Sequence, residues 1–162
     1  MNKKILYLTQ SALIAAIYVV LLLVFQSISY MDVQIRIAEA LTILPFFTPA
    51  AIPGVFLGCL IGGVLTGSLP IDYVFGSLTT LVAAYLSYKL RFNKKLVVVP
   101  PIFLNAIVVP WILRYGYGLA TPIPWMMITV GIGEVISVGL FGYVLLIALD
   151  KQKHIIFKNT TY

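Results

Sequence analysis

Residues 34–54 read QIRIAEALTILPFFTPAAIPG, and this stretch decides how many helices the chain forms. It starts with two charged positions, Arg36 and Glu39, and continues as an apolar run. Pro49, Pro53 and Gly54 then fall within six residues. Proline removes a backbone donor and clashes with the preceding helical turn, so this cluster predicts a helix boundary. We therefore expect two helices, rather than one long kinked helix, between residues 34 and 68.

The rest of the chain is equally apolar. Hydrophobic residues make up 61% of the 162 residues and charged residues only 10%, against about 25% charged in a typical soluble domain. The mean hydropathy is +1.05. Long uncharged runs separate the charges, and about 20 apolar residues suffice for one membrane crossing. We expect an all-α integral membrane protein. The first run, residues 5–28, is longer than a signal peptide's apolar region of about 7–15 residues, so we expect it to be retained.

The basic residues decide the topology. They fall into three clusters, at residues 3–4, 89–95 and 151–158. Basic residues favour the cytoplasmic ends of membrane spans, and only an even number of spans places all three clusters on that side. This distribution predicts a six-transmembrane-helix bundle with both termini cytoplasmic, and it argues against a nucleic-acid partner despite the net charge of +6. The chain is then one membrane domain, residues 1–162, with approximate spans 5–28, 34–48, 50–68, 71–90, 96–115 and 124–149.

The second span breaks the pattern of the others. Its apolar run of about 14 residues would reach only about 21 Å as an α-helix, short of the roughly 30 Å hydrocarbon core. Arg36 and Glu39 lie three positions apart, so they share a helix face. Charges inside a membrane segment usually face a cavity or the bundle interior. We expect these two residues to line an outer cavity; a mutual salt bridge is the alternative.

Glu134 is the most informative single residue. It lies about ten residues into the last span, where an ionisable group is costly unless it is paired or hydrated. The neighbouring Gly131 and Gly133 would let a ligand or another backbone approach closely. Contact with a ligand is the functional reading. The structural alternative is an ion pair with Arg36 or Arg114.

Two further polar residues are candidates for ligand contact. Asn105 is the only amide in its span, and it either binds a ligand or hydrogen-bonds two helices together. Asp72 begins the fourth span, where an acid suits the positive end of the helix dipole, so helix capping is the alternative. No nucleophile–base pair, metal-binding motif or phosphate-binding loop is present. We therefore predict no enzyme activity, no metal and no cofactor.

Small residues recur at four-residue spacing on two helices. Gly54, Gly58 and Gly62 form one stripe, which we expect inside the bundle, because such stripes allow close helix contact. Ala12 and Ala16 form another, extended by Ser11 and Ala15. This second stripe either packs internally or docks against another protein.

Four segments of the chain resemble the QueT family. The resemblance covers nearly the whole sequence, and its long first motif is specific. The segments are Val33-Gln34-Ile35-Arg36-Ile37-Ala38-Glu39-Ala40-Leu41-Thr42-Ile43-Leu44-Pro45-Phe46-Phe47-Thr48-Pro49-Ala50-Ala51-Ile52-Pro53-Gly54, Asp72 with Phe75-Gly76-Ser77-Leu78-Thr79-Thr80-Leu81, Pro100-Pro101 with Asn105-Ala106, and Val130-Gly131-Ile132-Gly133-Glu134.

The resemblance implies a transport function. Members of this family look like substrate-binding S components of energy-coupling factor (ECF) transporters, with a queuosine precursor such as preQ1 or preQ0 as proposed cargo. Energy would come from a shared module of one membrane coupling protein and two ATPases. In such families an A-x-x-x-A pattern on the first helix docks on the coupling protein, and Ala12 and Ala16 fit it. The cargo that the resemblance implies suits Glu134 and Glu39 as the acids that bind it, with Asp72 third, and Asn105 as the amide that binds its carbonyl edge. Arg36 is a candidate for substrate binding because of its place on the short second span.

Three other readings compete with this one. A solitary secondary transporter of a small nutrient would take up its substrate with an ion gradient and no ATPase, although we find no internal inverted repeat. An intramembrane enzyme would need paired catalytic groups. A structural membrane subunit would bind no 7-deazaguanine at all.

Overall fold

The computed structural model describes residues 3–29 and 34–156, and within them the backbone forms helices and turns without β-strand. The first helix, α1 (Lys3–Val24), is followed by the single turn α2 (Gln26–Ser29). A 3-10 helix, η1 (Ile37–Phe46), comes next. The remaining elements are α3 (Ala51–Leu65), α4 (Pro70–Lys89), α5 (Val99–Tyr115), α6 (Ile123–Glu134), the π-helix η2 (Val135–Gly142) and α7 (Tyr143–Ile156).

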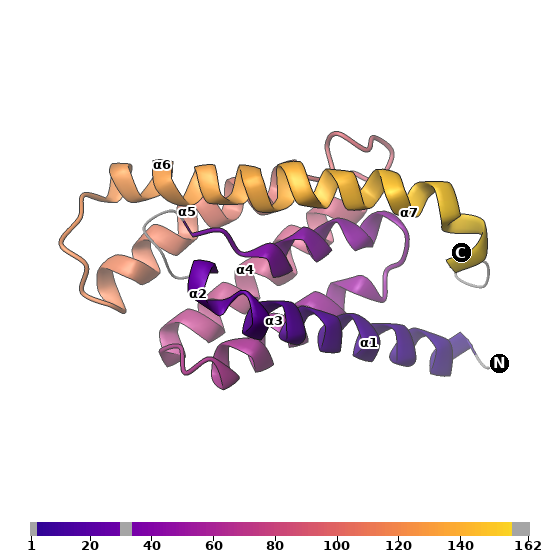
Figure 1. Ribbon diagram of the computed structural model, residues 1–162, viewed down its shortest axis with the longest axis horizontal. Helices are drawn as coiled ribbons and strands as arrows, with labels where there is room; N and C mark the ends of the chain where they lie inside the picture. The colour runs from indigo at the N-terminus through magenta and orange to yellow at the C-terminus, as the bar shows by residue number, and fades with distance from the viewer. Residues whose placement is uncertain (1–2, 30–33, 157–162) are drawn as a thin grey trace.

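These elements make six helical segments that run back and forth along the long axis of the molecule (Figure 1). The sixth is one continuous rod, because α6, η2 and α7 follow one another without a break. The start of α1 and the end of α7 lie at the same end of the molecule, and the loop between α5 and α6 lies at the other (Figure 1). The expected loop at residues 30–32 lies outside the described residues.

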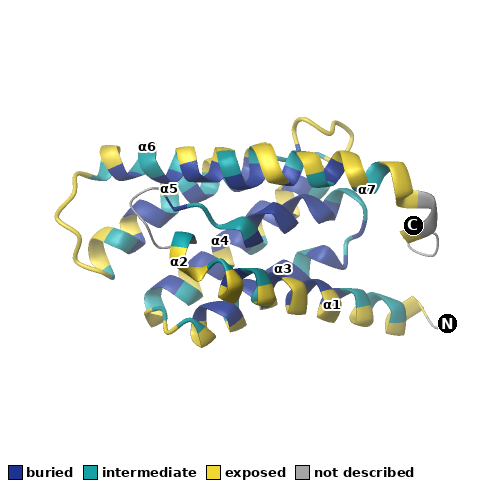
Figure 2. Ribbon diagram, viewed as in Figure 1, coloured by how far each residue is buried: buried dark blue, intermediate teal, exposed yellow. Residues whose placement is uncertain are grey.

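Two of the described helices are long and apolar enough to cross a membrane: α1, and the rod over Ile123–Lys153. Three shorter apolar helices accompany them: η1, α3 and α5. The helices carry many exposed positions (Figure 2). Large hydrophobic side chains occupy many of them, for example Leu8, Val24, Phe103 and Val144, so the outer surface agrees with an apolar environment. A soluble protein rarely exposes so continuous an apolar surface.

Proline and glycine explain where the helices begin and end. Pro70 and Pro100 lie in the first turns of α4 and α5, where the missing N–H costs nothing. The helix α3 ends in a Schellman turn: Gly67 has a φ of +74°, and the Ser68 N–H donates to the Gly63 carbonyl at 3.0 Å. The turn between η1 and α3 is short, because α3 starts at Ala51 and takes Pro53 into its first turn.

The expected internal glycine stripe is present at the contact between α1 and α3. Gly54, Gly58 and Gly62 are buried there. An ideal Cβ on Gly58 would lie 2.6 Å from the Tyr18 Cβ, and one on Gly62 would lie 2.7 Å from a Leu22 methyl carbon. The two helices are therefore as close as glycine alone permits.

The main departure from the sequence expectation is η1. An α-helix was expected there, but the segment winds as a 3-10 helix for ten residues, although such runs rarely exceed three or four residues. Two features favour the tighter winding. Pro45 cannot donate to an α-helical carbonyl partner. The Thr42 hydroxyl donates to the Glu39 carbonyl at 2.6 Å, which ties together residues three apart.

Candidate functional site

Buried polar side chains from all six helical segments meet in the interior. We call this set the inner cluster. These residues are far apart in sequence, and burial removes them from water, so their polar atoms need partners on neighbouring helices. Its members are Tyr18 on α1, Glu39 on η1, Cys59 on α3, Thr80 on α4, Asn105 on α5 and Glu134 at the end of α6.

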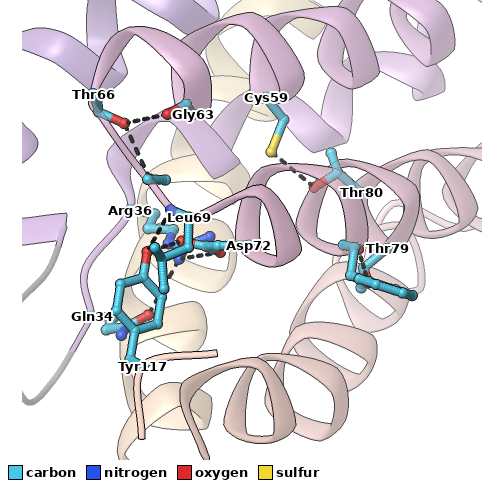
Figure 3. Close-up of polar contacts among 12 residues, drawn as sticks. Gln34, Arg36, Cys59, Gly63, Thr66, Leu69, Asp72, Thr79, Thr80 and Tyr117 are labelled. Carbon is cyan, nitrogen blue, oxygen red and sulfur yellow. Dashed lines mark hydrogen bonds and ion pairs between the residues drawn. The ribbon is translucent and has the colours of Figure 1, made fainter. Parts of the chain in front are cut away.

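Glu39 is 1% exposed and holds its carboxylate among three other helices. Its Oε1 accepts a hydrogen bond from the Tyr18 hydroxyl at 2.5 Å and a longer one from the Thr80 hydroxyl at 3.4 Å. The Thr80 hydroxyl also lies 3.8 Å from the Cys59 sulfur, as Figure 3 shows. One oxygen of this carboxylate is thus fixed by the protein.

Glu134 is 2% exposed and lies at the C-terminal end of α6. The Asn105 side chain, 3% exposed, interacts with both carboxyl groups, and the two carboxyl groups act electrostatically on each other. Neither of the expected arginines forms a salt bridge with Glu134 within the described ranges. Arg114 instead donates to the Leu119 carbonyl at 2.9 Å. The π-helix η2 begins at the next residue, and such segments are frequent at functional sites.

Three buried side-chain oxygens lack a hydrogen-bond partner among the described residues: Oε2 of Glu39, Oε2 of Glu134 and Oγ of Ser137. Ser137 is fully buried one turn after Glu134. An unsatisfied buried polar atom costs about 1–3 kcal/mol, and more if it is charged. Native proteins keep such atoms when a function requires them.

An outer cluster covers this site on the side of the α5–α6 loop; it comprises Gln34, Arg36, Asp72 and Tyr117 (Figure 3). The Arg36 guanidinium lies 3.8 Å from an Asp72 oxygen and 3.5 Å from the Gln34 side-chain oxygen. The Tyr117 hydroxyl donates to the other Asp72 oxygen at 2.8 Å and accepts from the Leu69 N–H at 3.4 Å. Partial burial and the hydrogen bond to Asp72 raise the pKa of Tyr117, so its hydroxyl stays a donor at neutral pH.

The outer cluster bears on two alternatives from the sequence analysis: an Arg36–Glu39 salt bridge and helix capping by Asp72. Arg36 pairs with Asp72 rather than forming a mutual salt bridge with Glu39, although its charge still acts on Glu39 and Glu134. Asp72 lies in the first turn of α4, where an acid suits the helix dipole, but no side-chain cap hydrogen bond exists at the start of this helix. Its carboxylate instead contacts Arg36 and Tyr117, which belong to other segments.

A cavity of about 20 Å³ lies between the two clusters. Such a volume holds roughly one water molecule and no heterocycle. This cavity would have to widen to admit a ligand of that size. Its lining residues are Tyr18, Leu22, Arg36, Cys59, Gly63, Ser68, Asp72 and Tyr73.

The small residues of α1 divide between two faces. Ser11 and Ala15 are buried against α3, where the Ser11 hydroxyl donates to the Ala50 carbonyl at 2.8 Å. Ala12 and Ala16 are exposed. The expectation that all four form one stripe was wrong, because 100° per residue turns adjacent positions toward different neighbours.

Sequence reasoning missed Tyr18, Thr80, Ser137 and Tyr117. Tyr18 lies three residues after Ala15 and seven after Ser11, the helical spacing of the buried face. Ser137 lies three residues after Glu134. Nothing in the sequence context of Tyr117 indicates that it bonds to Asp72. The described residues contain no group of three or more metal-binding side chains.

Comparison with known proteins identifies the family of the chain. A sequence model of the QueT transporter family matches residues 8–151. No curated protein and no solved structure matches the chain significantly. Membership of a transporter family, together with the apolar helices, indicates a membrane protein with a transport role rather than an enzyme. The chain belongs to the QueT transporter family.

Proposed function

We propose that the chain is the substrate-binding S component of an ECF transporter and that the inner cluster binds its cargo, a queuosine precursor such as preQ1 or preQ0. The observation that carries this proposal is the pair of buried carboxylates with unpartnered oxygens, Glu39 and Glu134. In a transporter, acids inside the membrane mark the substrate pathway.

The chemistry of the cargo suits the inner cluster. A 7-deazaguanine presents ring N–H groups and an exocyclic amine, which a carboxylate accepts as a pair. It also presents a carbonyl oxygen, to which the Asn105 amide can donate. The other carboxylate of the pair can accept a hydrogen bond from a further donor group on the ligand. Arg36 and Asp72 would then close the outer side of the site.

We place all six helical segments across the membrane with both termini in the cytoplasm. The basic residues support this topology, because Lys94 in the α4–α5 connection pairs with Asp150 of α7 at 2.6 Å. Asp150 also pairs with Lys153 at 3.2 Å. Two of the three basic clusters therefore meet at one end of the molecule, where the third begins α1 (Figure 1).

Transport against a gradient needs an energy source. The sequence contains no phosphate-binding loop pattern, which suits a protein that depends on two partner ATPases. A membrane coupling protein would link them to this chain. The exposed Ala12 and Ala16 offer a flat face on α1 for that contact.

A thermal-shift panel of the purified protein tests the binding function. We expect preQ1 or preQ0, but not guanine at the same concentration, to raise the melting temperature. A ligand at 100 times its Kd adds about 2.7 kcal/mol to the free energy of unfolding. The variants Glu134→Gln and Glu39→Gln should lose most of this shift.

The ligand-free melting temperature of Glu134→Gln distinguishes ligand contact from a structural role. Removing one member of a buried ion pair costs about 3–5 kcal/mol, whereas neutralising an unpaired acid should cost nothing. We expect an unchanged or higher melting temperature. A strong loss of stability in ligand-free Glu134→Gln, or a full ligand shift in both variants, would contradict the assignment.

A further inference from the structure

The inner cluster holds more acidic than basic side chains. Glu39 and Glu134 are both almost completely buried. Among the described residues, Arg36 is the cation that acts electrostatically on both of them. Arg36 lies 3.8 Å from Asp72, so much of its charge is already balanced by a third carboxylate. Three acids thus share one guanidinium in a medium that screens charge poorly.

The two inner carboxylates are not equivalent. Glu39 receives hydrogen bonds from the Tyr18 and Thr80 hydroxyls, in addition to its interaction with Asn105. For Glu134, the hydrogen-bonding side chain is Asn105, which it shares with Glu39. Both keep an unpartnered Oε2. Glu134 is therefore the acid whose charge the protein compensates least.

Bound ligand can supply the missing compensation. A hydrogen bond between two charged groups is about twice as strong as a neutral one, and more so in a dry site. A ligand cation is best placed beside the least compensated carboxylate. A carboxylate already held by two hydroxyls is pre-oriented, which suits a neutral donor edge.

We propose that the site selects a cationic ligand, with the positive group on Glu134 and a neutral donor edge on Oε2 of Glu39. This inference rests on the proposed binding function and gives its two acids different roles. Among 7-deazaguanines, it favours compounds with a protonated amine on the side arm over neutral ones of the same shape.

A matched pair of ligands tests the inference. The first is preQ1, whose aminomethyl arm is cationic; the second is 7-hydroxymethyl-7-deazaguanine, which has a neutral hydroxyl in the same place. Calorimetric titration of the wild-type protein should give about tenfold to hundredfold tighter binding of preQ1. Glu134→Gln should reduce this ratio to near one. Glu39→Gln should weaken both compounds by a similar factor and keep the ratio.

Glu134→Asp serves as the charge-retaining variant, and it should keep a preference for preQ1 even if absolute affinity falls. Equal wild-type affinities, or a preQ1 preference that survives in Glu134→Gln, would overturn the charge assignment and leave the proposed function standing. If neither compound binds the wild-type protein, the proposed function fails and this inference fails with it.

Discussion

Glu134 has a carboxylate in an interior that gives it few partners. Its burial removes water, and its neighbours replace only part of the lost solvation. The cost is tolerable because ligand binding can return it. Ser137, also buried and unpartnered, lies on the same helix one turn further on. We expect the region around these two residues to gain most order when a ligand binds.

Gly133, beside this acid, has a role that can be separated from that of its neighbour Gly131. An ideal Cβ on Gly133 would lie 2.1 Å from the Gln34 carbonyl oxygen, so the backbone before η1 would have to move. We expect Gly133→Ala to lower stability by about 1–3 kcal/mol and to weaken ligand binding, measured by thermal melting and titration.

Gly131→Ala is the matched control. Its Cβ would meet only the Ala106 Cβ at 3.6 Å, an ordinary contact. Alanine favours a helix by about 1 kcal/mol over glycine, so this variant should be as stable as the parent or more so. Equal behaviour of the two variants would show that the close approach of Gln34 is unimportant.

Three connections between helices meet at the outer cluster: the α5–α6 loop, the α3–α4 turn and the segment before η1. Tyr117 in the α5–α6 loop bonds to Asp72 and to the backbone of Leu69 at the α3–α4 turn. Asp72 in turn pairs with Arg36 before η1. Arg36 and Asp72 also line the cavity, so we expect these contacts to separate before a larger ligand enters. We infer that the Tyr117 hydroxyl acts as a latch: its bonds to Asp72 and Leu69 hold the α5–α6 loop against the α3–α4 turn in the closed state.

Removing that hydroxyl should make the closed state shorter-lived. Tyr117 is 38% exposed, so we assign its bond to Asp72 about 1 kcal/mol. Tyr117→Phe should then speed dissociation of bound ligand by about fivefold in a filter-binding chase. Tyr115→Phe is the control, because Tyr115 is 72% exposed and stacks on Trp111. A dissociation rate unchanged by Tyr117→Phe would argue against the latch.

At the scale of the whole molecule, binding and energy coupling should be separable. Ala16 is exposed on α1, on the opposite side from the glycine contacts with α3. We expect Ala16→Leu to keep normal ligand binding but to lose at least about tenfold in ATP-dependent uptake with the ECF module present, because small residues allow the close helix contact.

Ala148→Leu is the matched control, an exposed alanine of α7 that should tolerate the same change. Uptake is measured with labelled preQ1 in vesicles that contain this chain with and without the module. Uptake driven by an ion gradient without ATPases would instead support a solitary secondary transporter. Normal ATP-dependent uptake by Ala16→Leu would exclude the proposed docking face.

The sequence predicted the helical architecture and the acids well, because both depend on strong local signals. Uncharged runs separated by charges reveal helices, and an acid in an apolar run stands out whatever its neighbours are. Glu39 and Glu134 were found in this way, as was the amide of Asn105, and the structure places the three together. Their ligand contacts remain a proposal.

What escaped prediction depends on contacts between distant segments. Tyr18 and Thr80 are ordinary residues of apolar helices, and only packing reveals that both donate to Glu39. The same is true of the bond from Tyr117 to Asp72. The winding of η1 was missed for a different reason, because apolar periodicity does not separate a 3-10 helix from an α-helix over ten residues.

The tight winding of η1 has a consequence for how this segment can vary in length. Ten residues at about 2.0 Å each reach about 20 Å, for which an α-helix at 1.5 Å would need about 13. Residues three apart are eclipsed in such a helix, so Glu39, Thr42 and Pro45 share one row. Inserting or deleting one residue between Glu39 and Pro45 would turn the acid by about a third of a revolution. Insertions or deletions in this segment should therefore be tolerated best when they add or remove three residues, because Glu39 then keeps its direction.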